Sequence, residues 1–111
     1  NIAISNEETF PRDVSDREQL HDELRRMARR LAVHLTESGQ VARTVTTKLR
    51  YPDFSIRSRS TTLPAGLADG ERIGQVACDL LDRALADRPG ALRLVGVTVS
   101  KIEDFEQLAL A

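Results

Sequence analysis

The sequence has few of the residues that cross-link, anchor or catalyse. Its 111 residues contain one cysteine, no tryptophan, one tyrosine and three phenylalanines. The lone Cys78 excludes an internal disulfide and any cysteine-based zinc site, and a chain without disulfides is expected in the reducing cytoplasm. No apolar run approaches the ~18 residues that would span a membrane, and no signal-peptide pattern opens the chain. Because the first residue is Asn1 rather than methionine, we expect a fragment of a longer chain.

Motifs that carry chemistry are missing as well. The sequence has no nucleophile elbow, no glycine-rich phosphate loop and no HExxH-type metal spacing. His21 and His34 lie at the edge of an apolar helical stripe without a matching ligand set, and we expect both to be boundary residues. Asp53 follows Pro52, an order typical of turns. We therefore expect no catalytic residue, no metal site and no cofactor in this sequence, so that any enzymatic activity belongs to residues outside it.

Two stretches repeat apolar residues every three or four positions, which predicts amphipathic helices. The first begins at a capping box formed by Ser15 and Glu18 and runs to about residue 38, with Gly39 in the left-handed C-terminal position. The second has Asp69 as its N-cap and ends before Pro89. The repeated apolar positions are Leu20, Leu24, Met27, Leu31 and Leu35 in the first helix, and Ile73, Val76, Ala77, Leu80, Leu81 and Ala84 in the second.

Alternation of period two predicts strands over residues 2–10, 41–51, 54–63 and 92–100. Pro11 is expected to end the first strand, residues 51–53 to form a hairpin turn and residues 63–66 a loop. The order β-α-β-β-α-β indicates an α+β fold, in which two helices pack on one face of a four-stranded, mostly antiparallel sheet and the other face is open. With 41% hydrophobic and 30% charged residues, residues 1–101 are expected to form one soluble domain, followed by a tail of residues 102–111.

Positive charge is concentrated in the predicted hairpin. Residues 41–63 hold five Arg or Lys side chains against Asp53, a sum of +4, whereas the whole chain has a net charge of -1. The other 88 residues therefore sum to -5. A cationic hairpin in an otherwise acidic chain suits binding to phosphates.

The alternation assigns the hairpin side chains to two faces. Val45, Leu49, Tyr51, Phe54 and Ile56 are predicted to point toward the helices, with Ser58 and Ser60 on the same parity. The outward side chains are then Thr44, Thr46, Lys48, Arg50, Arg57, Arg59 and Thr61. Hydroxyls and cations on one face favour contact with the backbone of a duplex, and the lack of outward aromatic residues disfavours single-strand recognition by base stacking. The alternative is a merely solvated strand pair, since sheet edges often carry Lys and Arg.

Four segments together resemble one known family: residues 7–13 (EETFPRD), 43–54 (RTVTTKLRYPDF), 58–63 (SRSTTL) and 93–100 (RLVGVTVS). They are similar to the little-finger domain of Y-family DNA polymerases of the bacterial DNA polymerase IV (DinB) type, in order and over nearly the whole chain. The resemblance implies an error-prone polymerase for translesion synthesis in DNA repair, whose palm, fingers and thumb precede Asn1. It further implies magnesium ions in that palm, and a little finger that grips the primer-template duplex in the major groove. The protein is then expected to be a monomer and not to associate with a membrane.

The resemblance also implies which residues contact DNA and which bind a partner. Family members commonly end in a peptide of the form Gln-Leu-x-Leu-Phe that binds the replication sliding clamp; Gln107, Leu108 and Leu110 match it, whereas Ala111 replaces the aromatic residue. An alternative function is therefore a module that recruits the parent polymerase to the clamp. A third alternative, a ferredoxin-like regulatory domain for a small ligand, would require a deep apolar pocket. The residues that fall in the DNA-gripping strands are Arg43, Thr44, Thr46, Lys48, Arg57, Arg59, Ser60, Arg93, Thr98 and Ser100.

Overall fold

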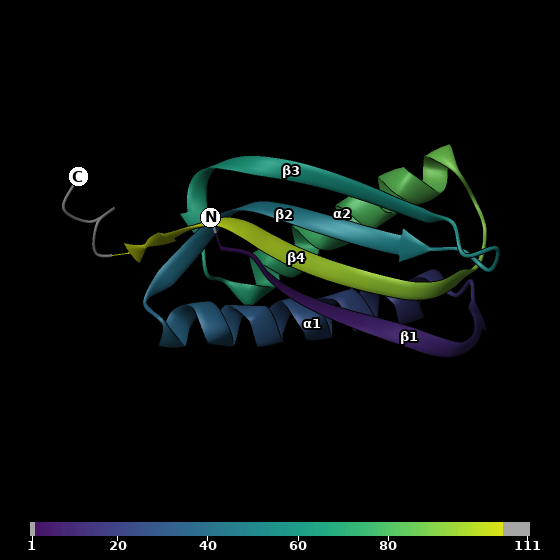
Figure 1. Ribbon diagram of the computed structural model, residues 1–111, viewed down its shortest axis with the longest axis horizontal. Coiled ribbons are helices and arrows are strands. Elements are labelled where there is room, and N and C mark those ends of the chain that lie inside the picture. Colours follow the sequence, from purple (N-terminus) through teal and green to yellow (C-terminus); the bar gives the residue numbers. More distant parts are fainter. Residues whose placement is uncertain (1, 106–111) are drawn as a thin grey trace.

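The protein, described by a computed structural model over residues 2–105, consists of a sheet layer and a helix layer (Figure 1). The elements are β1 (Ile4–Val14), α1 (Arg17–Glu37), β2 (Gln40–Arg50), β3 (Ile56–Leu67), α2 (Gly70–Asp87) and β4 (Leu92–Asp104). Both helices cover the same face of the four-stranded sheet, and its other face is left open. The predicted α+β class and element order are therefore confirmed.

The strand order is β1-β4-β2-β3, and every neighbouring pair is antiparallel. β1 and β2 consequently run in the same direction with β4 between them, and β3 and β4 do the same with β2 between them. The fold is thus two split β-α-β units, each of which receives a strand of the other. The two central strands, β4 and β2, are buried on their helix side, and the edges are formed by β1 and β3.

The core lies between the sheet and the two helices. The predicted stripe of α1 is buried, and α2 contributes its own buried row. From the sheet, Val45 and Leu49 of β2 meet the three valines of β4, Val95, Val97 and Val99, and all five are at most 1% exposed. Burial of this apolar surface, at roughly 25 cal/mol per Å2, is the main force that closes the two layers. Among the described residues, no helix is long and apolar enough to cross a membrane.

Both helix termini follow local capping rules, with one correction. Asp16, not Ser15, caps α1: its Oδ1 accepts hydrogen bonds from the backbone N–H groups of Glu18 at 3.0 Å and Gln19 at 3.3 Å. Asp69 caps α2 as predicted and accepts from the N–H of Glu71 at 2.9 Å. Gly39 follows α1 with a φ of 64°, the left-handed conformation expected of it.

Three strands extend past their predicted ends, among them β4, which runs to Asp104 rather than to Ser100. Pro11 does not end β1, which continues to Val14 through a register shift; β1 is an edge strand, where proline costs no ladder hydrogen bond. Residues 63–66 are not a loop but part of β3, which shifts register where Ala42 and Thr44 of β2 face it. Such irregularities raise the local twist and bend the edges of the sheet.

Candidate nucleic-acid interface

A row of four hydroxyl side chains crosses the uncovered face of the sheet, which we call the open face. Ser5 of β1 is paired with Thr98 of β4, Thr98 with Thr46 of β2, and Thr46 with Ser60 of β3. Two hydrogen bonds join them in pairs, Ser5 Oγ to Thr98 Oγ1 at 2.8 Å and Thr46 Oγ1 to Ser60 Oγ at 2.7 Å. Each pair uses one O–H internally, so the second O–H is free to donate outward.

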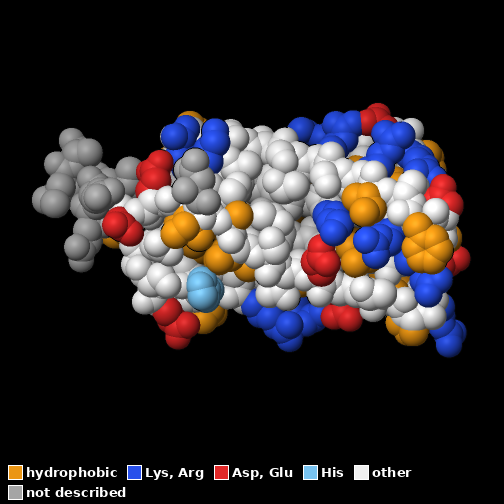
Figure 2. All heavy atoms as spheres, in the orientation of Figure 1, with side chains coloured by type: hydrophobic (Ala, Val, Ile, Leu, Met, Phe, Trp, Pro, Cys, Tyr) orange, Lys and Arg blue, Asp and Glu red, His pale blue; other side chains and the backbone are white. Residues whose placement is uncertain are grey.

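A second row runs parallel to the first, two residues along the strands. Ser100, Thr44 and Thr62 are paired across β4, β2 and β3. The Oγ1 atoms of Thr44 and Thr62 are 2.8 Å apart. The two rows, Ser5-Thr98-Thr46-Ser60 and Ser100-Thr44-Thr62, will be called the hydroxyl rows. Figure 2 shows the corresponding part of the surface as a broad uncharged area over the middle strands.

One ion pair bridges the central strand on the same face. Glu7, Gly96 and Lys48 are aligned across β1, β4 and β2, and Lys48 Nζ lies 2.8 Å from Glu7 Oε2. The pair passes over Gly96, where an added Cβ would lie only 3.1 Å from Glu7 Cγ and 3.2 Å from the carbonyl oxygen of Asn6. Glycine is therefore the residue that leaves room for Glu7 to lie over the strand and partly neutralise Lys48.

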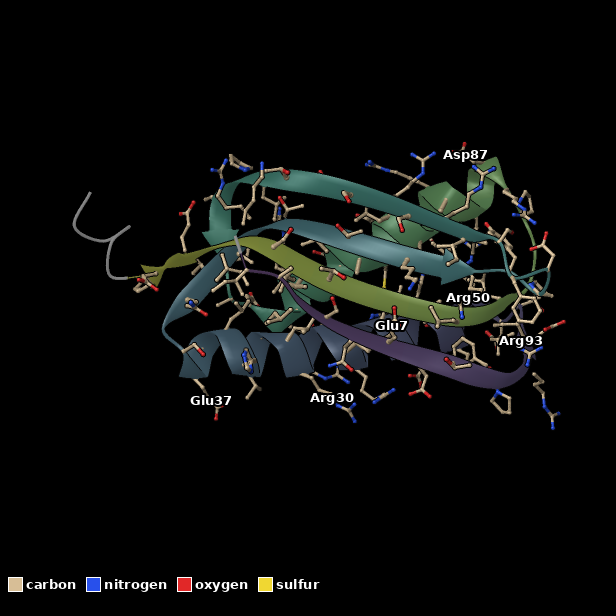
Figure 3. All side chains as sticks on the ribbon, in the orientation of Figure 1. Glu7, Arg30, Glu37, Arg50, Asp87 and Arg93 are labelled. Carbon is tan, nitrogen blue, oxygen red and sulfur yellow. The ribbon has the colours of Figure 1, made fainter. Side chains whose placement is uncertain are left out.

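β3 presents the opposite face to the one predicted. Arg57, Arg59 and Thr61 are paired with Leu49, Thr47 and Val45, whose side chains are buried toward the helices. The prediction that these three point outward is therefore wrong, and so is the inward prediction for Ser58 and Ser60. Arg59 instead forms an ion pair with Asp87, which Figure 3 shows at the end of α2. The two arginines lie along the helix-side margin of the edge strand.

The helix side of β2 contains one buried hydroxyl that the sequence did not single out. Thr47 is fully buried and its Oγ1 donates to the carbonyl oxygen of Ala77 in α2 at 2.9 Å. This bond satisfies a polar group that would otherwise be costly in the core. The hydroxyl of Thr47 thus stabilises the core, whereas those of its neighbours Thr44 and Thr46 lie on the open face.

The phase of β3 is set by the turn that precedes it. Tyr51 is buried as predicted, but Phe54 is 78% exposed with a φ of 71°, and Ile56 pairs with the outward Arg50. The inward predictions for Phe54 and Ile56 are therefore wrong. The connection between β2 and β3 has five residues, 51–55. Because of its length, even-numbered residues of β3 face outward, and each following side chain lies on the face opposite to the one predicted.

Arg88, just after α2, braces this turn. Its guanidinium lies 4.0 Å from the centre of the Tyr51 ring and donates to Asp53 Oδ2 at 3.0 Å and to Ser55 Oγ. The Tyr51 hydroxyl donates to the carbonyl oxygen of Arg88 at 2.8 Å. Hydrogen bonds from the Ser55 side chain and backbone, and then from Arg88, lower the pKa of Asp53 to about 2. The predicted turn role of Asp53 is confirmed.

The remaining predicted arginines lie at opposite ends of the sheet. Arg43 is near the start of β2, and its Nε donates to the carbonyl oxygen of Leu63 at 3.2 Å. Arg93 is near the start of β4, where its Nε donates to the carbonyl of Phe10 at 3.4 Å. Figure 3 shows Arg93 at the same end as Arg50, which faces outward in β2. Arg50 forms no ion pair with any residue that the structure describes.

The structure brings together Thr44, Thr46, Lys48, Ser60, Thr98 and Ser100 on the open face. Ser5 and Thr62 were not predicted as members of the hydroxyl rows, and only the strand order and the phase of β3 could have indicated them. Gln107, Leu108 and Leu110 lie outside the described residues. Within residues 2–105, no cluster of three or more His, Cys, Asp or Glu side chains could hold a metal ion.

The helical side of the protein is chemically different. A groove of about 490 Å3 lies between α1 and α2 and is lined by charged side chains of both signs, among them Arg25 and Asp82. His21 Nε2 donates a hydrogen bond to Asp82 Oδ1 at 2.8 Å. Burial raises the pKa of the Cys78 thiol to about 11. Five hollows in the described part of the chain are open to solvent, and none of these five is the deep apolar pocket that the small-ligand alternative requires.

Comparison with known sequences gives one family over almost the full length. The sequence pattern of the impB/mucB/samB family C-terminal domain matches residues 2–110. DNA polymerase IV of Streptococcus pyogenes serotype M5 (strain Manfredo) is 31% identical over 102 residues, which cover 92% of this chain and 28% of that protein. The chain therefore spans less than a third of the length of the curated relatives it matches.

Solved structures share the fold at lower identity. A post-insertion binary complex of Dbh DNA polymerase matches with a TM-score of 0.80 and 20% identity, over 91% of this chain and 29% of that one. DinB from Sulfolobus solfataricus matches with a TM-score of 0.75 and 19% identity, over 89% and 28%. The little finger domain of PolIV, solved in complex with the beta-clamp processivity factor, matches with a TM-score of 0.69 and 15% identity, over 89% and 87%.

Proposed function

The chain belongs to the impB/mucB/samB family of C-terminal domains, and on that premise we propose that it is the duplex-binding little finger of an error-prone translesion DNA polymerase. The observation that carries the proposal is the pair of hydroxyl rows on an open sheet face. Their Ser and Thr side chains are short, so the sugar-phosphate backbone of a duplex can approach the sheet closely over a broad area. Hydroxyl and cation contacts of this kind position a protein on a duplex without reading its sequence.

The proposed mechanism is a grip on phosphates. The free O–H groups of the rows donate to phosphate oxygens, and Lys48 exchanges its bond with Glu7 for one with a phosphate. Arg50 and Arg93 at one end of the sheet and Arg43 at the other add charge where the duplex leaves the face. Arg57 and Arg59, on the edge strand, reach phosphates only from the margin. A sheet that contacts both backbones in the major groove holds the primer-template in place for chemistry that occurs elsewhere.

The chemistry is assigned to the rest of the parent polymerase. The nucleotidyl transfer and its magnesium ions belong to a palm domain, and we propose no catalytic role for residues of this chain. Acids near the open face support this division, because Glu7 is committed to Lys48 and Asp53 to Ser55 and Arg88. We propose a cytoplasmic location, because a chain whose one cysteine leaves no internal disulfide suits a reducing compartment.

The proposal is tested by the salt dependence of binding. Fluorescence anisotropy of the 111-residue chain with a labelled blunt duplex is measured over about 50 to 300 mM salt. About six phosphate contacts give a slope of log K against log salt near -5. An affinity that does not change with salt contradicts the proposal.

A pair of matched variants tests the hydroxyl rows themselves. Thr46→Val combined with Thr98→Val removes two hydroxyls of the first row with little change in shape, and is expected to weaken binding about tenfold, at roughly 0.5–1.5 kcal/mol per bond. Thr36→Val, exposed on α1, is the control and should bind like the parent chain. Equal affinity of the double variant and the control would remove the rows from the interface.

We also propose a second function, recruitment to the sliding clamp. It is supported by Gln107, Leu108 and Leu110 in the proposed tail, residues 102–111, and by the likeness to a little finger solved with a beta clamp. β4 continues to Asp104, so the first three tail residues lie in the sheet. Deletion of residues 107–111 should abolish binding to a bacterial clamp and leave duplex affinity unchanged; unchanged clamp affinity counts against the tail.

A further inference from the structure

The turn between β2 and β3 holds an aromatic ring in solvent on an unfavourable backbone. Phe54 is 78% exposed, and its φ of 71° is an outlier for a bulky residue. Two backbone hydrogen bonds fix this conformation, from Phe54 N to the Tyr51 carbonyl and from Tyr51 N to the Ser55 carbonyl, both at 2.9 Å. Strain of this kind persists only where the surrounding structure imposes it, and it is found at functional sites more often than elsewhere.

The turn is rigid rather than frayed. Arg88 ties it to the end of α2 through Asp53 and Ser55, and its guanidinium stacks on the buried Tyr51. A glycine at position 54 would adopt the same φ without strain. The side chain is therefore held outward by a braced backbone, which costs little entropy when a ligand contacts it.

The surroundings of Phe54 indicate which ligand fits. Ile56 is 49% exposed and pairs with Arg50 on the open face, and Arg57 follows it as an exposed cation. Figure 2 shows hydrophobic side chains beside Lys and Arg side chains at this end of the face. The acid in the turn, Asp53, is compensated by Arg88. An aromatic platform among cations, continuous with a face for phosphates, is complementary to a nucleotide.

A paired duplex presents phosphates and groove edges along its length, and its internal bases are covered on both sides by their stacked neighbours. An unpaired nucleotide can turn its base out and offer a π-face to a side chain. The hydroxyl rows match the first kind of surface and Phe54 matches the second. Stacking was disfavoured because Phe54 was predicted to point inward, and the exposure of its ring removes that objection at this position.

We propose that Phe54 is a stacking site for an unpaired nucleobase at the margin of the bound duplex, with Arg50 and Arg57 on its flanking phosphates. The inference rests on the proposed duplex binding. It predicts that the chain prefers a duplex with a single-stranded overhang to a blunt one, and that the preference depends on the ring of residue 54.

The test compares two labelled probes, a blunt duplex and the same duplex with an overhang of about six nucleotides, the latter carrying 2-aminopurine at the junction. Phe54→Leu should weaken overhang binding at least about fivefold, the smallest effect typical of one stacked base, and leave blunt-duplex affinity unchanged. Quenching of 2-aminopurine should disappear in Phe54→Leu and return in Phe54→Tyr. Val33→Ala, a second exposed apolar site, 57% exposed on α1, should affect neither probe.

The outcomes separate this inference from the proposed function. If neither probe binds, duplex binding itself fails; if both bind and Phe54→Leu changes neither, only the stacking site fails. An equal loss on both probes would make Phe54 part of the duplex contact and overturn the inference. Sedimentation velocity tests whether Phe54 instead contacts a second copy of the chain. A dimer that becomes a monomer in Phe54→Leu would assign Phe54 to a dimer interface and would also overturn the inference.

Discussion

The open face and the helical face use their polar groups in different ways. On the helices, acids and bases are intermixed and pair locally, as Arg25 does with Asp22 at 3.1 Å. Arg26 contacts both Glu23 and Glu8, and the Glu23 hydrogen bond is the main reason that the pKa of Arg26 is raised. On the open face, hydroxyls pair with hydroxyls, and among the described residues Lys48–Glu7 is the ion pair that crosses the middle of the face.

The difference matters because the two kinds of pair leave different groups unused. A carboxylate and a guanidinium satisfy each other's charge, and exposed pairs are worth only about 0–1 kcal/mol. Two hydroxyls leave one O–H unused and carry no charge that would repel a phosphate. The net charge of -1 therefore says little about partners, since a face can suit an anion when its acids are few and tied to other groups.

The largest effect is expected where the open face is closest packed. Gly96→Val would place a side chain 3.1 Å from Glu7 Cγ and 3.2 Å from the Asn6 carbonyl, and β1 would have to move. We expect a loss of about 1–3 kcal/mol in the free energy of unfolding, as for other overpacked sites, together with weaker duplex binding. Urea denaturation and the anisotropy assay measure the two effects.

The matched control lies between the helices. A Cβ at Gly74 would meet Ala28 Cβ and Arg25 Cα at 3.5 Å, an ordinary contact. Gly74→Ala should leave stability unchanged or raise it by up to about 1 kcal/mol, because alanine loses less backbone entropy in a helix. If both variants were equally tolerated, the close packing of β1 over Gly96 would not be a constraint of the open face.

An intermediate effect is expected from the ion pair across β4. Glu7→Gln removes the acid that neutralises Lys48, so duplex affinity should rise about two- to fivefold, the range that corresponds to an exposed ion pair. The salt slope should become steeper by about 1, because no acid beside Lys48 then offsets its charge at the phosphate. Stability should change by less than about 1 kcal/mol, because both side chains are partly exposed.

Asp22→Asn is the corresponding change on the helical face. It breaks the local ion pair with Arg25 on the helical face. Neither the duplex affinity nor the salt slope should change. An equal gain in both variants would mean that total charge, rather than the open face, controls binding.

The parts that the sequence could predict are those where apolar residues alternate with polar ones. In β2 and β4 the buried Val45, Leu49, Val95 and Val97 fix the inward side, so the outward side of both strands follows. The helices are predicted for the same reason, since their apolar stripes recur at the helical period.

β3 could not be predicted because it has no such anchor. From Ile56 to Thr62 the strand consists of polar residues after its first position, and a strand without an apolar face has a weakly specified register. Its phase came from the length of the turn and the conformation of Phe54. The strand order is likewise absent from periodicity, so neither the Ser5–Thr98 bond nor the Glu7–Lys48 pair could be foreseen.

The smallest effect concerns the turn at the end of the open face, where hydrogen bonds hold the ionised carboxylate of Asp53. The pKa of Asp53 is about 2, below its ordinary value of 3.8, so its ionised form is favoured by folding. Its contribution to stability is therefore complete above about pH 4 and is lost as pH falls toward 2. The difference in Tm between the parent chain and Asp53→Asn should be largest near neutral pH and shrink over that window.

The cause of the low pKa is separable from its effect. The hydrogen bond from the Ser55 side chain is the largest contribution, ahead of Arg88, so Ser55→Ala should raise the pKa of Asp53 toward its ordinary value in an NMR titration of the carboxyl group. Arg88→Gln should raise it less. The opposite ranking would mean that the ion pair with Arg88, rather than the hydrogen bonds within the turn, is the main support of the Asp53 carboxylate.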